Sequence, residues 1–502
     1  MQRLFTVLII LSGIILVAAG LYVVILGPVD KLSAINVAVI APGDQEVAWL
    51  HPATNFATWE RFVVGLKELP DVVVDESAAF PEDSMKLPVV GLSKPGYSGT
   101  LWIRWYKLTG LRTIEKWVSE LCQRQPRPLA VVGGGNSERA RDIALQLARQ
   151  KLVDRQLLPV FLITTATAEK VQHPELGIVD LMQIYPQRSF RYCFTNRQMA
   201  EAIHHFVREQ ISQDRELQIT SSRISLISWK DDPFSHDLVE QFEASWRIPS
   251  EQVPQPQVAS YAIAHSVGAL NQPNKLEMAT VEKLVREVSG ESVAVRGREL
   301  LVLPAGPAPA RRFLRSLYHT DPNERFLWVV TVGDAIDWNT LYRDRRLTWP
   351  VVDVPFPLIA FMHRNPVEMQ LKLGRGFVAD DSTEQTPNPS GTDDLLLYRD
   401  IGHSLVTACF RNQQLASQPD ILRQSLRAEV NENQQPLFDE DGNRPDMAGE
   451  YITLLRPVHE ELRIAPLSRI EVYVRKSQAK SWQRIIQLQA TYSNDRLVRG
   501  KP

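Results

Sequence analysis

The chain has 502 residues, of which 56 are lysine or arginine and 58 are aspartate or glutamate, so its formal net charge is −2. Hydrophobic residues make up 44% of the sequence and charged residues 23%, which is an ordinary globular composition. This balance excludes the strongly basic surface on which nucleic-acid binding depends, and the length predicts more than one domain.

The N-terminal segment is apolar. No charged residue occurs from Leu4 to Leu26, and as a helix this run would be about 34 Å long, enough to cross a bilayer core. Arg3 precedes the run, so the positive-inside rule places the body of the protein outside the cytoplasm. We therefore expect residues 1–28 to be a transmembrane anchor. The alternative is a cleaved signal peptide with its site near Ala18-Ala19-Gly20, although the apolar run continues past that site.

Along the body of the chain, short apolar strands alternate with amphipathic helices. The first block has expected strands at Ile35–Ala41 and Leu101–Tyr106, expected helices at Asn55–Leu69 and Ile114–Cys122, and an elaborated connection from Asp71 to Ser98. The second block has expected strands at Arg223–Trp229, Val258–His265, Glu299–Leu303 and Phe326–Thr331. After it come an expected long helix at Asp394–Gln414 and tail strands at Tyr451–Leu455 and Ile470–Val474. This alternation is typical of parallel sheets flanked by helices, and two blocks predict two lobes.

The chemically most informative segment runs from Leu129 to Gln150. An apolar strand leads into a glycine turn and then into a helix, through the residues Gly133-Gly134-Gly135-Asn136-Ser137. Glycines let backbone N–H groups approach a ligand closely, and Asn and Ser are good helix N-caps. Because a helix N-terminus carries a partial positive charge, the turn is suited to an anionic group such as a carboxylate. The alternative is a tight strand–helix connection without a ligand.

A second turn of similar chemistry follows the next strand. The strand Leu158–Ile163 leads into Thr164-Thr165-Ala166-Thr167. Since neighbouring parallel strands end at the same edge of a sheet, the two turns predict a cleft that binds a small polar molecule. The alternative is that these threonines only cap the next helix.

No motif for catalysis, a cofactor or a metal stands out. The glycine turn lacks the third glycine of a dinucleotide site, and neither a Walker loop nor GxSxG or HExxH occurs. Four residues have the spacing of a calcium loop: Asp439, Asp441, Asn443 and Glu450. Arg444 stands where that loop requires glycine, so we predict a polar turn. His204-His205 is no metal pair, because adjacent helical residues face different ways.

Three widely spaced cysteines, Cys122, Cys193 and Cys409, form no CxxC pair, which excludes a zinc ribbon and a thioredoxin-type motif. Their odd number leaves at least one free thiol, and a disulfide between two of them stays open. No cysteine precedes Cys122, so a lipoprotein anchor is not expected.

The order of these segments resembles the type I periplasmic binding proteins, the substrate-binding components of branched-chain amino-acid ABC transporters. The likeness extends from about Ile35 to Pro457. It rests on the segments Leu129–Ala148, Leu158–Val171, Ser189–Asn196, Ile224–Phe242, Leu396–Asp400, Phe438–Arg444 and Tyr451–Thr453, which follow one another in the family's order. The family often has Tyr-Gly after the acidic turn of the second lobe, where this chain has Phe234-Ser235.

The resemblance implies where a ligand would be held. In amino-acid binders of this family, a hydroxyl after the first turn and a small residue with a threonine after the second hold the ligand, while an acid of the second lobe meets its ammonium group. The expected ligand-binding residues are accordingly Gly135, Asn136, Ser137, Thr165, Ala166, Thr167 and Asp334.

The resemblance also implies an α/β fold of two lobes, each a parallel sheet flanked by helices, behind one N-terminal transmembrane helix. We expect lobe 1 to comprise residues 34–193 and about 355–435, and lobe 2 residues 194–354 and about 436–502. Hinge strands are expected near Arg191–Asn196, Val351–Phe356 and Pro436–Asn443, and the lobes would close on a ligand by bending there.

The implied function is that of a periplasmic solute-binding protein, not an enzyme. It would capture an amino acid or related carboxylate for ABC-type transport or sensing, without a cofactor, with an ABC permease or an envelope protein as partner. The alternative is a membrane-anchored scaffold that keeps the fold without a small-molecule ligand. The elaborated segment Asp71–Gly99 favours the scaffold, and the turn Gly133–Ser137 favours the binder.

Overall fold

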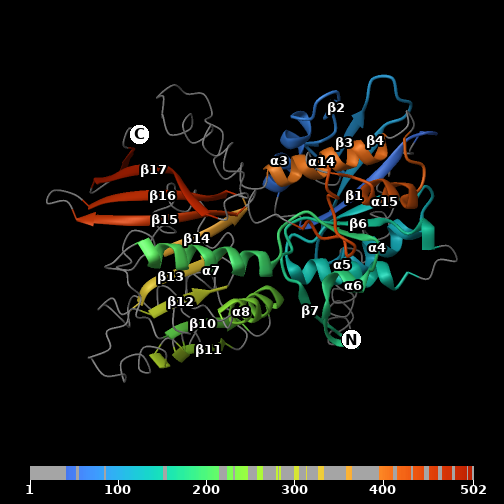
Figure 1. Ribbon diagram of the computed structural model, residues 1–502. Coiled ribbons are helices and arrows are strands. Elements are labelled where there is room, and N and C mark those ends of the chain that lie inside the picture. Colours follow the sequence, from blue (N-terminus) through green and yellow to red (C-terminus); the bar gives the residue numbers. More distant parts are fainter. Residues whose placement is uncertain are drawn as a thin grey trace, which may run out of the picture.

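The computed structural model describes part of the chain, as two sheets flanked by helices (Figure 1). The described residues are 41–52, 56–83, 86–150, 155–213, 223–229, 232–246, 257–263, 279–280, 282–283, 299–304, 313, 326–332, 358–363, 395–410, 415–430, 434–445, 452–461, 466–476, 481–493 and 496–499. In these ranges no helix combines the length and the apolar character that a membrane span requires. Residues 1–28 lie outside them, so the anchor and its alternative, a signal peptide, stay predictions.

The first sheet has the strand order β2-β3-β4-β1-β5-β6-β9. Its strands are β1 (Gln45–Pro52), β2 (Val73–Asp75), β3 (Val89–Ser93), β4 (Leu101–Leu108), β5 (Ala130–Gly133), β6 (Val160–Ile163) and β9 (Ser189–Arg191). β4, β1, β5, β6 and β9 are parallel, while β2 and β3 extend one edge by antiparallel pairing. The expected parallel sheet is thus confirmed, and the carboxyl ends of β1, β5 and β6 meet at one edge.

The first strand of this sheet differs from the expected one. Ile35–Ala41 lies almost wholly outside the described residues, so that strand stays a prediction, and β1 is formed by Gln45–Pro52, which was not expected to be a strand. The charged Glu46 interrupts the apolar pattern of this segment, so the sequence did not predict a buried strand here. Its buried carboxylate accepts hydrogen bonds from Nη1 of Arg104 at 2.8 Å and from the hydroxyl of Tyr106 at 2.7 Å, and it also pairs with Arg124. These partners satisfy a charge that would otherwise be costly to bury.

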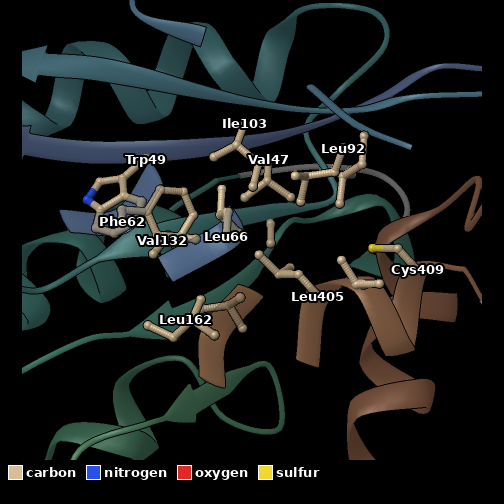
Figure 2. Close-up of a cluster of buried hydrophobic side chains, with 14 of the residues drawn as sticks. Val47, Trp49, Phe62, Leu66, Leu92, Ile103, Val132, Leu162, Leu405 and Cys409 are labelled. Atoms are coloured by element: carbon tan, nitrogen blue, oxygen red, sulfur yellow. The ribbon is translucent and has the colours of Figure 1, made fainter. Parts of the chain in front are cut away.

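Both faces of the first sheet are covered by helices. Successive residues of β1 point to opposite faces, so β1 contributes to the core on each side. Val47 and Trp49 face α3 (Phe56–Lys67), α14 (Leu395–Cys409) and α15 (Pro419–Arg427). Figure 2 shows this core between the sheet and the two helices α3 and α14. Ala48 and Leu50 face α4 (Ile114–Gln123), α5 (Ser137–Ala148) and the short α6 (Leu181–Ile184). Each large side chain buried here stabilises the fold by about 1.5–3 kcal/mol.

The second sheet has the strand order β11-β10-β12-β13-β14-β15-β16-β17-β18. Its strands are β10 (Arg223–Trp229), β11 (Gln257–Ile263), β12 (Glu299–Leu303), β13 (Phe326–Val332), β14 (Leu358–His363), β15 (Ile452–Glu461), β16 (Pro466–Lys476), β17 (Ser481–Ser493) and β18 (Arg496–Arg499). β10 to β13 are parallel, as expected, and β14, a strand that the sequence patterns did not predict, extends the parallel pairing. β15 to β18 form an antiparallel meander. The helices α7 (Asn196–Gln213) and α8 (Pro233–Trp246) pack together beside this sheet.

The chain passes between the two sheets more than once. β14 lies past the expected lobe limit near residue 355 and pairs with β13 and β15 in the second sheet, whereas α14 and α15 pack on the first. Two expected hinge segments run side by side, since the amide of Arg191 donates to the carbonyl of Gly442 at 2.8 Å. The third, Val351–Phe356, lies outside the described residues. The lobe limits and the hinge motion stay predictions.

All three cysteines are free and buried, so the disulfide left open by the sequence is absent.

The segment with calcium-loop spacing forms a closed polar turn in its described part, up to Pro445. Oδ1 of Asp439 accepts from the amide of Asn443 at 2.8 Å, and the amide of Gly442 donates to the carbonyl of Asp439 at 3.0 Å. Gly442 has φ +94°, and a Cβ there would lie 2.1 Å from the carbonyl oxygen of Ser189. Only glycine fits this contact with β9.

Candidate functional site

The glycine turn and the threonine turn lie side by side at the carboxyl edge of the first sheet. β5 and β6 pair in parallel through Gly133 and Ile163, so both turns begin at the same level. The amide and the hydroxyl of Thr164 both donate to the carbonyl of Gly133, at 2.9 and 3.1 Å. Open α/β sheets bind ligands at this kind of edge.

The three glycines of the first turn have different roles. A Cβ on Gly133 would lie 2.8 Å from Cδ1 of Ile143, and one on Gly134, which has φ +79°, would lie 2.9 Å from Cβ of Ala140. These two glycines therefore serve the tight packing of α5 against β5. Gly135 has more room, since the nearest atom to a Cβ there is Nη1 of Arg139 at 3.3 Å. Of the three, Gly135 is the position where the backbone is open to a ligand.

Asn136 is the N-cap of α5. Its φ and ψ are −153° and 167°, and its Oδ1 accepts from the amide of Arg139 at 2.8 Å. Ser137, the first residue of the helix, is only 2% exposed, and its Oγ accepts from the amide of Ala168 at 3.2 Å. The serine hydroxyl thus joins the two turns to each other, whereas Asn136 stays at the surface.

The second turn does not cap a helix. It leads into the hairpin β7 (Lys170–His173) and β8 (Gly177–Asp180). Ala166 and Thr167 are buried, and their carbonyls accept from Sγ of Cys193 at 3.2 Å and from the amide of Asn196 at 2.8 Å. Thr165 is partly exposed. The structure therefore brings six expected site residues together but leaves only Gly135, Asn136 and Thr165 accessible. Their role in ligand binding stays a prediction.

The helix α8, which packs beside the second sheet, brings a carboxylate to this turn. Asp237 of α8 is 1% exposed, and it accepts from the amides of Glu169 at 2.9 Å and Lys170 at 3.1 Å. Nδ2 of Asn196 donates to the same carboxylate at 2.8 Å. Burial raises the pKa of Asp237, although these hydrogen bonds act in the opposite direction. In Figure 1, α8 reaches across to β7 at this point.

Two residues that the sequence reasoning did not single out lie beside Gly135. A Cβ on Gly135 would be 3.3 Å from Nη1 of Arg139 and 3.7 Å from Nε2 of His51, which stands at the carboxyl end of β1. Burial lowers the pKa of His51 to about 4, and the charge of Arg139 acts in the same direction. The imidazole is therefore neutral at neutral pH.

Comparison with known proteins identifies the fold. No family model and no curated protein matches the sequence. Among solved structures, the leucine-binding protein LivK from Thermotoga maritima is similar over 88% of this chain and 98% of its own, with a TM-score of 0.50 at 12% identity. A putative branched-chain amino acid ABC transporter protein from Silicibacter pomeroyi is similar over 82% of this chain and 93% of its own, with a TM-score of 0.50 at 11% identity. The chain has the type I periplasmic-binding-protein fold. These neighbours are binding proteins of transport systems and not enzymes.

On the side of the second sheet, the N-terminus of α8 lies near the candidate site. Asp232 caps that helix, since its Oδ1 accepts from the amide of Phe234 at 3.0 Å, and Oγ of Ser235 accepts from the amide of Trp229 at 3.0 Å. Burial raises the pKa of Asp232, and the carboxylate of Glu138 in α5 adds to this effect. α5 and α8 also contact each other directly. Asp334, the expected acid of this lobe, lies outside the described residues.

A sequence signal exists for one of the two residues that were missed. Arg139 lies in the first turn of α5, where the helix dipole favours acidic side chains, so a basic residue there is unusual. His51 carries no such signal, because its place beside the glycine turn depends on the parallel pairing of β1 with β5.

Proposed function

We propose that the protein is an extracytoplasmic solute-binding protein that holds a small polar ligand, an amino acid or a related carboxylate, between its two lobes. The observation that carries this proposal is the pair of adjacent turns at the carboxyl edge of the first sheet, with Gly135 and Asn136 open at the N-terminus of α5. Partial positive charge at that helix end favours a carboxylate. The similar fold of transport-system binding proteins supports it.

Residues 1–28 would tether this body to the membrane, with the ligand-binding lobes on the outer face, as the apolar run and Arg3 predict. A ligand that contacts both lobes would stabilise the closed form through its differential affinity for that form. The closed form would then deliver the ligand to an ABC permease or signal to an envelope partner.

The second candidate is a scaffold that keeps the fold without a ligand. One observation favours it: the hydroxyl of Ser137 and the carboxylate of Asp237, both at the carboxyl edge, are engaged by the protein's own amides. In such a scaffold the lobes would be held together by internal hydrogen bonds rather than by a solute.

A thermal-shift screen of the full chain in detergent micelles tests the proposal, with amino acids and small organic carboxylates as probes. A ligand at a hundredfold excess over its Kd stabilises the folded state by about 2.7 kcal/mol. Gly135→Val should abolish the shift, because its side chain would project between Arg139 and His51, where the ligand is proposed to bind. Gly110→Val is the matched control, since a Cβ at Gly110 meets nothing within 4 Å.

If no compound shifts the unfolding temperature, the solute-binding proposal is wrong and the scaffold is favoured. If a compound stabilises both glycine variants as well as the wild type, the protein binds a solute, but at another site.

A further inference from the structure

The guanidinium of Arg139 makes no direct ion pair with a described carboxylate, although the charge of the neighbouring Glu138 acts to raise its pKa. The adjacent carboxylate of Glu138 pairs with Arg141 instead, at 3.7 Å between Oε1 and Nη2, and Arg141 also pairs with Asp142 at 2.8 Å. Arg139 is half-buried, and this burial lowers its pKa. A half-buried cation without a direct ion pair keeps N–H groups that an anionic ligand can engage.

His51 supplies an acceptor next to this cation. Its Nδ1 lies 3.4 Å from the carbonyl oxygen of Pro52. A carbonyl oxygen only accepts, so Nδ1 carries the proton, and Nε2 of the neutral ring is left with its lone pair. Nε2 is also the ring atom on the Gly135 side. The side chain is 7% exposed, and no described residue donates to Nε2.

Aromatic rings extend from His51 to the surface. The ring of Trp105 lies 6.3 Å from that of His51, the ring of Phe56 lies 5.4 Å from Trp105, and that of Phe80 lies 5.5 Å from Phe56. Phe56 and Phe80 are 41% and 42% exposed. The indole N–H groups of Trp49 and Trp105 are buried without a hydrogen-bond partner among the described residues. Trp105 is buried and stacked on Trp59, so an apolar group bound here would contact the exposed rings of Phe56 and Phe80.

We infer that the site takes a small organic carboxylate that has a hydroxyl next to the carboxylate and an apolar or aromatic body. The carboxylate would bind the guanidinium of Arg139 and the N-terminus of α5, and the hydroxyl would donate to Nε2 of His51. The body would lie towards the exposed rings of Phe56 and Phe80. A free amino acid fits less well, because its ammonium would lie beside the charge of Arg139. This inference rests on the proposed function, since it names the ligand class of the same site.

Isothermal titration calorimetry on the full chain in detergent micelles tests the inference with four probes that share one body. The probes are 3-phenyllactate, 3-phenylpropanoate, phenylalanine and the uncharged 3-phenylpropanamide. We expect 3-phenyllactate to bind tightest, 3-phenylpropanoate and phenylalanine to bind more weakly, and the amide to show no binding. Leucine and 2-hydroxy-4-methylpentanoate form a matched pair that tests an aliphatic body.

Variants separate this inference from the proposed function. Arg139→Gln should weaken 3-phenyllactate binding at least tenfold, and Arg139→Lys should restore part of the affinity. Arg149→Gln, the control at the other end of the same helix, should leave it unchanged, because Arg149 has only an exposed pair with Glu175. If any probe binds with the same affinity to wild type and Arg139→Gln, or if an amino acid binds tighter than its hydroxy analogue, the inference is wrong while solute binding stands. If no probe and no compound of the thermal screen binds, both are overturned.

Discussion

Two groups of polar residues at the same edge of the first sheet contrast with each other. Around Ser137 and Asp237, hydroxyl and carboxylate oxygens accept from backbone amides of the neighbouring turn. Around Gly135, by contrast, Arg139 has no ion pair in the described chain and Nε2 of His51 accepts no described donor. Positions 137 and 139 are two residues apart, yet one side chain is engaged within the protein and the other is left for a ligand.

This contrast shows how a binding fold divides its polar groups. The satisfied group fixes the two turns and α8 in place, because a buried polar atom that lost its partner would cost about 1–3 kcal/mol. The unsatisfied group keeps unused hydrogen-bonding capacity at a place held rigid by the first. Binding sites depend on such support from the surrounding shell.

The largest expected effect concerns pH. The pKa of His51 is about 4 in the folded protein, against an ordinary value of 6.5. Between these values the unfolded chain binds a proton that the folded chain excludes, so stability falls as the pH drops from 6.5 towards 4. This term amounts to about 3 kcal/mol. Chemical denaturation of wild type and His51→Gln at pH 7 and pH 4 should show the greater loss in wild type, and equal losses would contradict it.

A smaller effect is expected at the satisfied group. Asp237→Ala leaves the amides of Glu169 and Lys170 without their acceptor and removes one of the two acceptors of Nδ2 of Asn196. We expect a loss of about 2 kcal/mol in the free energy of unfolding, measured by urea denaturation. Glu240→Gln on the same helix is the control, since its half-exposed pair with Lys170 is worth less than about 1 kcal/mol. An Asp237→Ala protein as stable as this control would remove the support role of Asp237.

The smallest stability effects are expected within the glycine turn. Gly134→Ala places a Cβ at a φ of +79° and 2.9 Å from Cβ of Ala140, and should cost about 1–2 kcal/mol. Gly135→Ala should be nearly neutral for stability, because the nearest atom to its Cβ is the flexible end of Arg139 at 3.3 Å. Thermal denaturation of the pair distinguishes the two positions. If Gly135→Ala is as destabilising as Gly134→Ala, position 135 is structural as well.

Most of the layered fold could be predicted from local patterns. The strand, turn and helix from Ala130 to Ala148, the parallel strands β10 to β13 and the long helix near residue 400 lie close to their expected places. β1 could not be found in this way, because the burial of Glu46 depends on Arg104 and Tyr106, which are 58 and 60 residues away. The short edge strands β2 and β3 fall in the segment expected to be an elaborated connection.

The candidate site was predictable in position but not in composition. Apolar strands followed by glycine and hydroxyl residues identified the two turns and the edge they share. The pattern could not show which hydroxyls face outwards, since Ser137 turns towards the amide of Ala168, 31 residues further on. Nor could it bring His51 to the glycine turn, which requires the pairing of β1 with β5.

The sequence by itself determined the alternation of strands and helices and the strand ends at which the chain turns, because periodicity and glycine placement are local properties. Only the tertiary structure decided which polar groups are paired within the protein and which are left open. Whether a polar group is paired depends on contacts between segments that are distant in the chain. A hydroxyl or a guanidinium has the same intrinsic chemistry wherever it stands, and its neighbours in space set whether it supports the fold or binds a ligand.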